Sequence, residues 1–171
     1  MADCDCNIDD IARECGKNAG GVKPLLYITC EDEVASIGAA SDHAVSTITM
    51  RAADDPITKG YFRQWKCSRK DSDFKSTQDE EGGQWNTEFK YFIPKQAATK
   101  AVVLNNLGED NNIGVVTDMN GAKRIVGELG NPVNITVEEV TTPKNGYAVT
   151  GKWTSGYSPY FFTGTPDVSP T

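Results

Sequence analysis

The sequence predicts a mainly β fold, a β-sandwich or small barrel of about eight strands with one flanking α-helix at residues 95–107. The clearest sign is strict alternation of apolar and polar side chains over residues 84–93, the period of a half-buried strand. The face that this pattern assigns to the core carries Trp85, Thr87, Phe89, Tyr91 and Ile93. In addition, 16 glycines and 8 prolines in 171 residues indicate the many turns that an all-β fold needs.

The first half of the chain contains three further candidate strands. Residues 22–30 predict the first, and Pro24 favours a sheet edge for its start. Residues 43–52 alternate in the same way, and residues 60–68 predict a third strand.

The clearest hairpin joins residues 74–78 to residues 84–93. The turn between them is acidic, with Asp79, Glu80 and Glu81 followed by two glycines. Glycines supply the positive φ that such a turn requires, so we expect a tight, charged hairpin tip.

One helix and a meander account for the rest of the predicted domain. Pro94 is expected to open the helix and Gly108 to close it. Asn120-Gly121 between two apolar runs is a strong hairpin signal. The expected strands of the meander are residues 112–117, 122–128, 133–140 and 147–154.

Two terminal arms flank the predicted single β-rich domain at residues 22–154. Residues 1–21 and 155–171 are too short and too polar to form cores of their own. Aromatic side chains in the C-terminal arm would either dock on a partner or fold back over the chain's own barrel. We expect that deletion of either arm leaves the domain folded, with nearly unchanged melting, but abolishes or shortens its polymers.

Charge and hydropathy exclude several classes of protein. The formal net charge of −7 disfavours tight binding to a phosphate backbone. The basic cluster of Arg63, Lys66, Arg69 and Lys70 is interleaved with carboxylates and is interpreted as a solvated strand edge. We find neither an apolar run of about 20 residues that would span a membrane nor a signal peptide, so synthesis in a cytoplasm is expected.

No residue pattern predicts a metal or cofactor site. Five cysteines, unevenly spaced, suit neither a disulfide framework nor zinc, so structural or free thiols are expected. The glycines at positions 16, 20 and 21 do not follow a strand of a βαβ unit, so no dinucleotide fingerprint is present.

Catalysis is not expected either. A Ser–His–acid triad would depend on His43, the only histidine, whose neighbours along the chain point in different directions. The acidic pairs at 54–55, 80–81 and 138–139 are adjacent residues rather than carboxylates that converge on a cleft. We therefore predict that the protein is not an enzyme.

The order of elements after residue 60 carries a resemblance to a known family. It consists of the hairpin strand at 85–94, the alanine-rich helix, the runs IGVVTDMNG at 113–121 and KNGYAVTG at 144–151, and PYFF at 159–162. This order resembles structural proteins of tailed bacteriophages, especially tail tube–like proteins from phages and prophages of Bacteroidetes hosts. The chain departs from that family in its longer, cysteine-bearing N-terminal arm, and only residues 51–62 and 70–84 are candidates for the ring-stacking loop.

The resemblance implies a virion structural protein, the tail tube subunit, located in the phage tail and made in the host cytoplasm. Its partners would be copies of itself in stacked, ring-forming homo-oligomers (hexamers), other tail or neck proteins, and DNA as non-specific cargo in a negatively charged lumen, with no membrane and no cofactor. The residues expected to make assembly contacts are Ile8, Ile11, Asp79, Glu80, Glu81, Tyr157, Tyr160, Phe161 and Phe162.

Two alternatives stay open. A phage neck, connector or tail-completion protein would share the same resemblance. A soluble β-sandwich that binds a ligand or carbohydrate through Trp65, Trp85 or Trp153 is the alternative from a different class.

Overall fold

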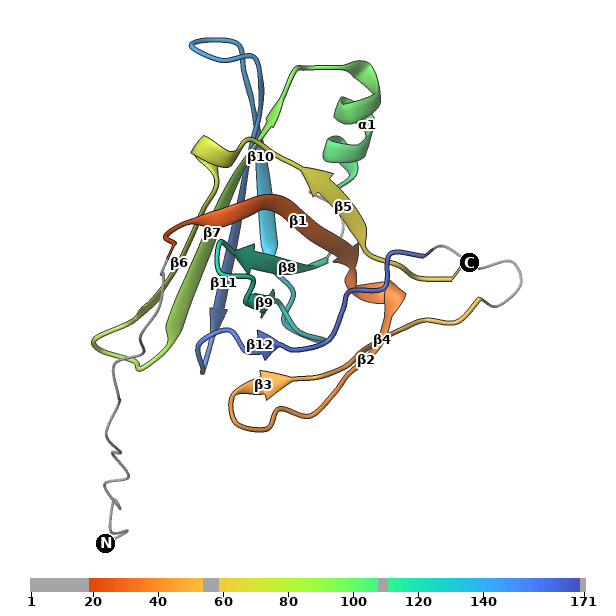
Figure 1. Cartoon of the computed structure of the whole chain (residues 1–171), viewed down its shortest axis with the longest axis vertical. Helices are drawn as coiled ribbons and strands as arrows, with labels where there is room; N and C mark the ends of the chain where they lie inside the picture. Colours follow the sequence, from red (N-terminus) through yellow and green to blue (C-terminus); the bar gives the residue numbers. More distant parts are fainter. Residues whose placement is uncertain (1–18, 54–58, 108–110, 170–171) are drawn as a thin grey trace, which may run out of the picture.

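Three sheets and one α-helix form the described part of the chain, residues 19–53, 59–107 and 111–169, in this computed structural model (Figure 1). Strands account for 51% and helices for 10% of the described residues, which confirms the predicted mainly β class. Within these residues there are twelve strands rather than about eight, because several are only two to four residues long.

A six-stranded sheet lies at the centre of the molecule. Its order is β3 (Ala44–Val45), β12 (Phe161–Phe162), β9 (Lys123–Val126), β8 (Asn112–Asp118), β1 (Val22–Cys30) and β5 (Arg63–Lys66). Apolar layers cover both of its faces: Leu26 and Val116 contribute to one core, Ile113 and Val115 to the other. Burial on both faces explains why the middle of β8, residues 113–116, is apolar without alternation.

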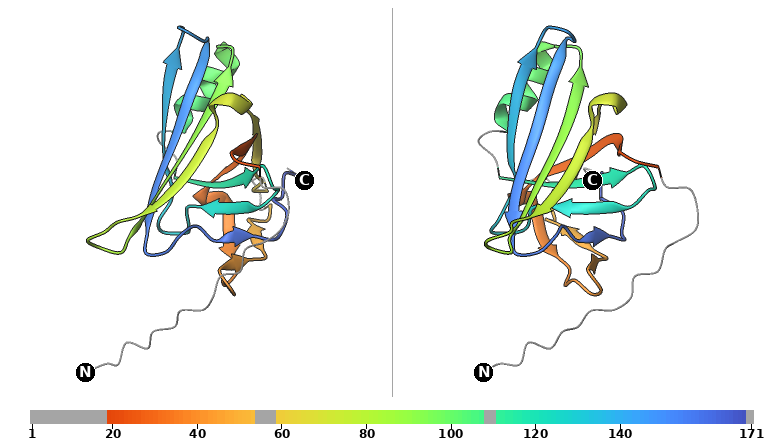
Figure 2. Two further views of the ribbon diagram at one scale, coloured as in Figure 1. Left: turned by 60° about the vertical axis from the view of Figure 1, so that its left-hand side comes forward. Right: turned by 90° about the vertical axis from the view of Figure 1, so that its left-hand side faces the viewer.

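A four-stranded antiparallel sheet packs on one face of the central sheet. Its order is β10 (Asn134–Val140), β11 (Gly146–Ser155), β7 (Trp85–Pro94) and β6 (Asp73–Gln78). Phe89 and Tyr91 of β7 are at most 1% exposed, as the alternating pattern predicted. Figure 2 shows this sheet in front, with α1 and the central sheet behind it, so that its other face is uncovered.

A small β-layer covers the opposite face of the central sheet. It consists of β2 (Val34–Ile37), which follows the 3₁₀ turn η1 (Glu31–Glu33), and β4 (Ile48–Met50). Val34, Met50 and Phe62 close the second core. The predicted strand at 43–52 is therefore split into β3 and β4.

The helix α1 spans Ala98–Asn106 and starts later than predicted. Pro94 still belongs to β7, and Lys95 has a φ of 63°, which is incompatible with a right-handed helix. Leu104 and Leu107 anchor the helix in the main core.

Residues 155–169 fold back over the chain's own β-rich domain, which is the second of the two arrangements expected for the aromatic side chains of the C-terminal arm. Phe162 is only 4% exposed, and β12 pairs with β3 on one side and β9 on the other. The sequence analysis did not anticipate a strand here.

Candidate assembly site

The four-stranded sheet ends on both sides in strands that have no second strand neighbour on their outer side within the described part of the chain. These edge strands are β6 and β10. Every neighbouring pair in the sheet is antiparallel, so β6 and β10 run in opposite directions. A second copy that placed its β10 beside β6 would therefore continue the antiparallel pattern without a break.

The uncovered face of this sheet is polar and electrically balanced. Glu88 lies between two lysines, 3.1 Å from Lys90 Nζ and 3.9 Å from Lys152 Nζ. The hydrogen bond from Lys90 and the nearby positive charges lower the pKa of the Glu88 carboxyl. The charged side chains on this face are Asp73, Lys75, Glu88, Lys90, Glu138 and Lys152.

The two ends of the sheet differ in charge. The tip of the β6–β7 hairpin carries Asp79, Glu80 and Glu81, all exposed as predicted. At the opposite end lie the β10–β11 loop and the 3₁₀ turn η2 (Arg69–Asp71), which are joined by a 2.7 Å ion pair from Lys144 to Asp71 (Figure 1). That hydrogen bond lowers the pKa of Asp71.

The opposite end is basic overall. Arg69, Lys70 and Lys95 are exposed there, in addition to Lys144. Four cations thus lie at the end of the sheet away from the acidic tip.

The remaining residues expected to make assembly contacts fall into three groups. Tyr157 and Tyr160 are half-buried, and Phe162 is core. Phe161 is 37% exposed, with the Arg124 guanidinium 4.3 Å from its ring centroid. Ile8 and Ile11 lie outside the described residues.

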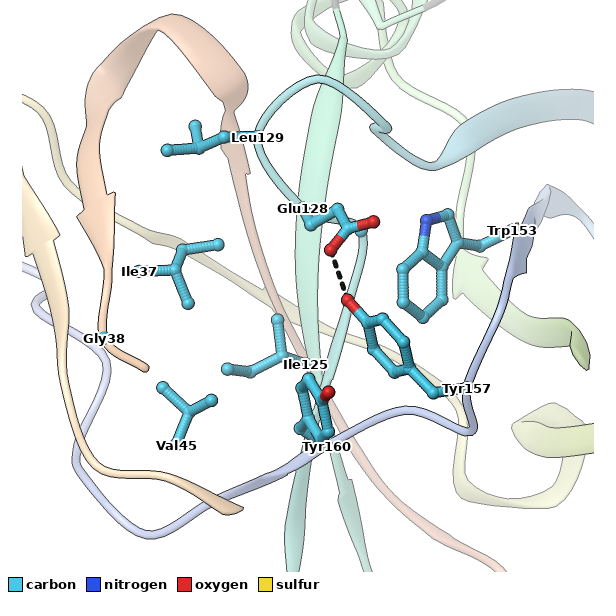
Figure 3. A pocket seen from close by; sticks show the side chains of 10 residues that line it. Ile37, Gly38, Val45, Ile125, Glu128, Leu129, Trp153, Tyr157 and Tyr160 are labelled. Atoms are coloured by element: carbon cyan, nitrogen blue, oxygen red, sulfur yellow. Dashed lines mark hydrogen bonds between the residues drawn. The ribbon is translucent and has the colours of Figure 1, made fainter. Parts of the chain in front are cut away.

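The two tyrosines form one wall of a pocket of about 240 Å³ (Figure 3). Their rings stack at 4.3 Å and 18°, and the Trp153 ring meets Tyr157 edge-on at 6.0 Å. Tyr157 donates its hydroxyl proton to the Glu128 carboxylate. We call this cavity the aromatic pocket; its lining also includes Ile37, Val45, Ile125 and Leu129.

The Tyr157 hydroxyl is held in its protonated form. Burial is the main cause of its raised pKa, and the hydrogen bond to Glu128 adds to it. Sequence reasoning missed this site because Glu128 follows β9, about thirty positions before Tyr157, and no local pattern connects the two.

The structure places a serine against the only histidine. Ser158 Oγ lies 2.7 Å from His43 Nε2, and the imidazole packs edge-on against Tyr160 at 4.8 Å. Within the described residues no carboxylate is bonded to the imidazole, which a triad would require. The contact joins the C-terminal segment to the turn before β3.

The structure describes two of the five cysteines, Cys30 and Cys67, and Cys67 is a free thiol. Burial raises the pKa of Cys67 to about 12. Cys4, Cys6 and Cys15 lie outside the described residues. Among the residues that the structure describes, no group of three or more histidine, cysteine or acidic side chains could hold a metal ion.

We expect native Cys67 to react with iodoacetamide at pH 8 at least about a hundredfold more slowly than the same thiol in the unfolded chain, because only the thiolate attacks. The test uses a variant in which the other four cysteines are serine. Rates are compared in buffer and in urea by mass spectrometry. Equal rates would mean that the thiol is accessible and ionised as an ordinary cysteine is.

The structure does not gather the three tryptophans proposed for a carbohydrate site. Trp65 lines a groove beside α1, Trp85 lines a cavity with Asp118 and Arg124, and Trp153 lines the aromatic pocket. Trp153 is itself only 3% exposed and donates its indole N–H to the Asn131 carbonyl.

Comparisons with known proteins found no significant match. The chain matches no protein family, and no curated protein or solved structure is significantly similar to it. None of the helices in the described residues has the length and apolar character needed to cross a bilayer.

Proposed function

We propose that the protein is a virion structural subunit that assembles with copies of itself, as the tail tube subunit of a tailed bacteriophage does. The observation that carries this proposal is the four-stranded antiparallel sheet, in which β6 and β10 are edge strands within the described residues and one face alone is covered. Its function is to pair edge to edge with neighbours in a closed ring, and the rings stack into a channel for DNA.

The topology favours a head-to-tail ring. Each subunit offers β6 on one side and β10 on the other, so each contact joins two different surfaces, and such contacts close by rotation. Because α1 and the central sheet fill the covered face, that face would lie outside and the polar face would line the lumen.

The face proposed to line the lumen would bind DNA only weakly. Three lysines and three carboxylates balance one another on it, so the chain's acidic excess is not concentrated there. A balanced polar wall without a basic stripe would let a phosphate backbone pass without specific binding. This differs from the negatively charged lumen expected from the net charge.

The charge difference between the two ends of the sheet supports stacking. With strands along the ring axis, the acidic tip of one ring would face the basic end of the next. Opposite charges across a contact favour encounter and register. The tip residues Asp79, Glu80 and Glu81 would then be assembly contacts.

A charge swap across the proposed edge contact tests the ring. Lys75 on β6 and Glu138 on β10 are exposed on the lumen face of their strands. Either Lys75→Glu or Glu138→Lys places like charges on the two facing edges, and we expect the concentration for half-assembly to rise at least about tenfold. Sedimentation velocity and electron microscopy measure this.

The decisive control combines the two charge changes, either in one chain or in a mixture of the two single variants. The double variant, and an equimolar mixture of the single variants, again places opposite charges on facing edges. In the mixture the two variants must alternate, so only rings with an even number of subunits can close. Recovery of assembly by the mixture would therefore indicate an even-membered ring, as expected for a hexamer. Lys152→Glu, on an interior strand of the same face, should assemble like the wild type. A strict monomer at high wild-type concentration would overturn the proposal.

Neutralising the tip separates the tail tube from a neck, connector or tail-completion role. In Asp79→Asn/Glu80→Gln/Glu81→Gln, a tube-forming protein should still form rings but shorter stacks. A protein that functions as one ring would show the same particles before and after the change.

A further inference from the structure

Glu128 is the only charged side chain among the described residues that line the aromatic pocket. Its Oε2 accepts the hydrogen bond from Tyr157. Within the described part of the chain, no hydrogen bond or ion pair involves its Oε1. Glu128, a half-exposed residue, therefore brings a carboxylate to a cavity whose described lining contains no positive charge to balance it.

The pocket has two chemically different walls. Ile37, Val45 and Leu129 form an aliphatic wall on one side, and Leu129 is 43% exposed at the β9–β10 turn (Figure 3). Glu128 lies with Tyr157 and Trp153 on the other side. Aromatic rings attract cations through their negative π faces, but Tyr160 stacks on one face of Tyr157, so only the remaining ring faces can contribute. The Glu128 carboxylate is therefore the main feature of this wall that favours a positive group.

The size of the cavity limits the ligand. About 240 Å³ is smaller than the roughly 300–1,000 Å³ of a typical drug-sized site, so the pocket fits a ligand the size of one side chain. A neutral sugar would need several polar partners, whereas the polar side-chain groups among the described lining residues are Glu128, the tyrosine hydroxyls and the Trp153 indole N–H, which already donates to the Asn131 carbonyl. An anion would meet an uncompensated carboxylate.

We propose that the aromatic pocket binds a primary alkylammonium group, with the ammonium at Glu128 Oε1 beside the tyrosine rings and the methylene chain along Ile37, Val45 and Leu129. The ligand is either a small amine or the side chain of a lysine from a second copy, since both present the same chemistry. This site lies outside the β6 and β10 edges, so the proposal does not depend on ring formation.

Titration with n-pentylammonium chloride tests the site, with amide chemical shifts of the ¹⁵N-labelled protein as the readout. We expect saturable shifts at Glu128, Tyr157 and Tyr160. Glu128→Gln keeps an acceptor for the Tyr157 hydroxyl but removes the charge, and should weaken binding at least tenfold. Asp32→Asn, an exposed change of the same charge outside the pocket, should leave binding unchanged.

Pentan-1-ol, which has the same chain without the charge, separates a cation site from a simple apolar cavity. We expect it to bind at least tenfold more weakly than pentylammonium to the wild type. Equal affinities, or a Glu128→Gln protein that folds and binds pentylammonium normally, would overturn the proposal. The pentanol comparison holds even if Glu128→Gln does not fold.

Measurements of self-association distinguish the two possible sources of the ammonium group. If it is a lysine of a second copy, both Glu128→Gln and excess pentylammonium should reduce self-association in sedimentation. If it is a free amine, self-association should be unchanged while binding is retained. The edge variants Lys75→Glu and Glu138→Lys should bind pentylammonium normally, so failure of the ring and failure of the pocket are distinguishable.

Discussion

Replacing Phe89 with alanine is expected to lower the free energy of unfolding by about 3–5 kcal/mol, because the change removes a fully buried ring and leaves a cavity. Phe89 is 0% exposed and packs edge-on against Tyr91 at 5.9 Å. Urea denaturation followed by circular dichroism measures the loss. Val102→Ala, at a position 63% exposed on α1, is the control and should change stability by less than about 0.5 kcal/mol.

Gly151 provides a second measurement of the same contact. A methyl group there would lie 2.1 Å from the Phe89 ring, so Gly151→Ala should destabilise the protein on its own. In the Phe89→Ala background the ring is gone, and the added methyl should cost much less. We expect a coupling of at least about 1 kcal/mol between the two changes, and additive losses would mean that the ring does not pack on Gly151.

Deletion of residues 157–171 should cost more than about 5 kcal/mol, which is comparable with the whole stability of many domains. The deletion removes β12 from the central sheet, Phe162 from the second core, and the Tyr157 hydrogen bond to Glu128. Thermal melting and one-dimensional NMR of the truncated chain measure the effect. This reverses, for the C-terminal segment, the expectation that its loss leaves melting nearly unchanged.

Two neighbouring phenylalanines provide a milder test of the same segment. Phe162→Ala should cost about 3–4 kcal/mol, whereas Phe161→Ala, at 37% exposure, should cost clearly less. A truncated protein with the wild-type melting temperature, or equal costs at the two positions, would show that this segment is not part of the core. For residues 1–18, the expectation that deletion preserves the fold stays a prediction.

Local patterns were sufficient for the long strands. Residues 22–30 were predicted as a strand and form β1 with the same bounds, and the alternation around Phe89 assigned the buried face of β7 correctly. In both strands, the pattern that predicts the strand lies within the strand's own residues. The late start of α1 is different, because it depends on the positive φ of Lys95, which the helical periodicity does not reveal.

The features missed from the sequence depend on distant partners. The two residues of β12 form a strand only because β3 and β9 lie on either side of them. The aromatic pocket needs Glu128 from one segment and Tyr157 from another. Likewise, strands were predicted at 74–78 and 133–140, where β6 and β10 lie, but only the sheet order shows that both are edges.

The position of β12 has a consequence for how the chain is made on the ribosome. Among the described residues, β3 has no strand neighbour except β12, although the paired residues Ala44 and Phe161 are 117 positions apart in sequence. Domains usually fold as units while synthesis proceeds from the N-terminus. Here the central sheet cannot be completed until residues 161–162 have left the ribosome, so the nascent chain lacks a complete fold until β12 has emerged. Protomers would therefore become competent to join others only after that point.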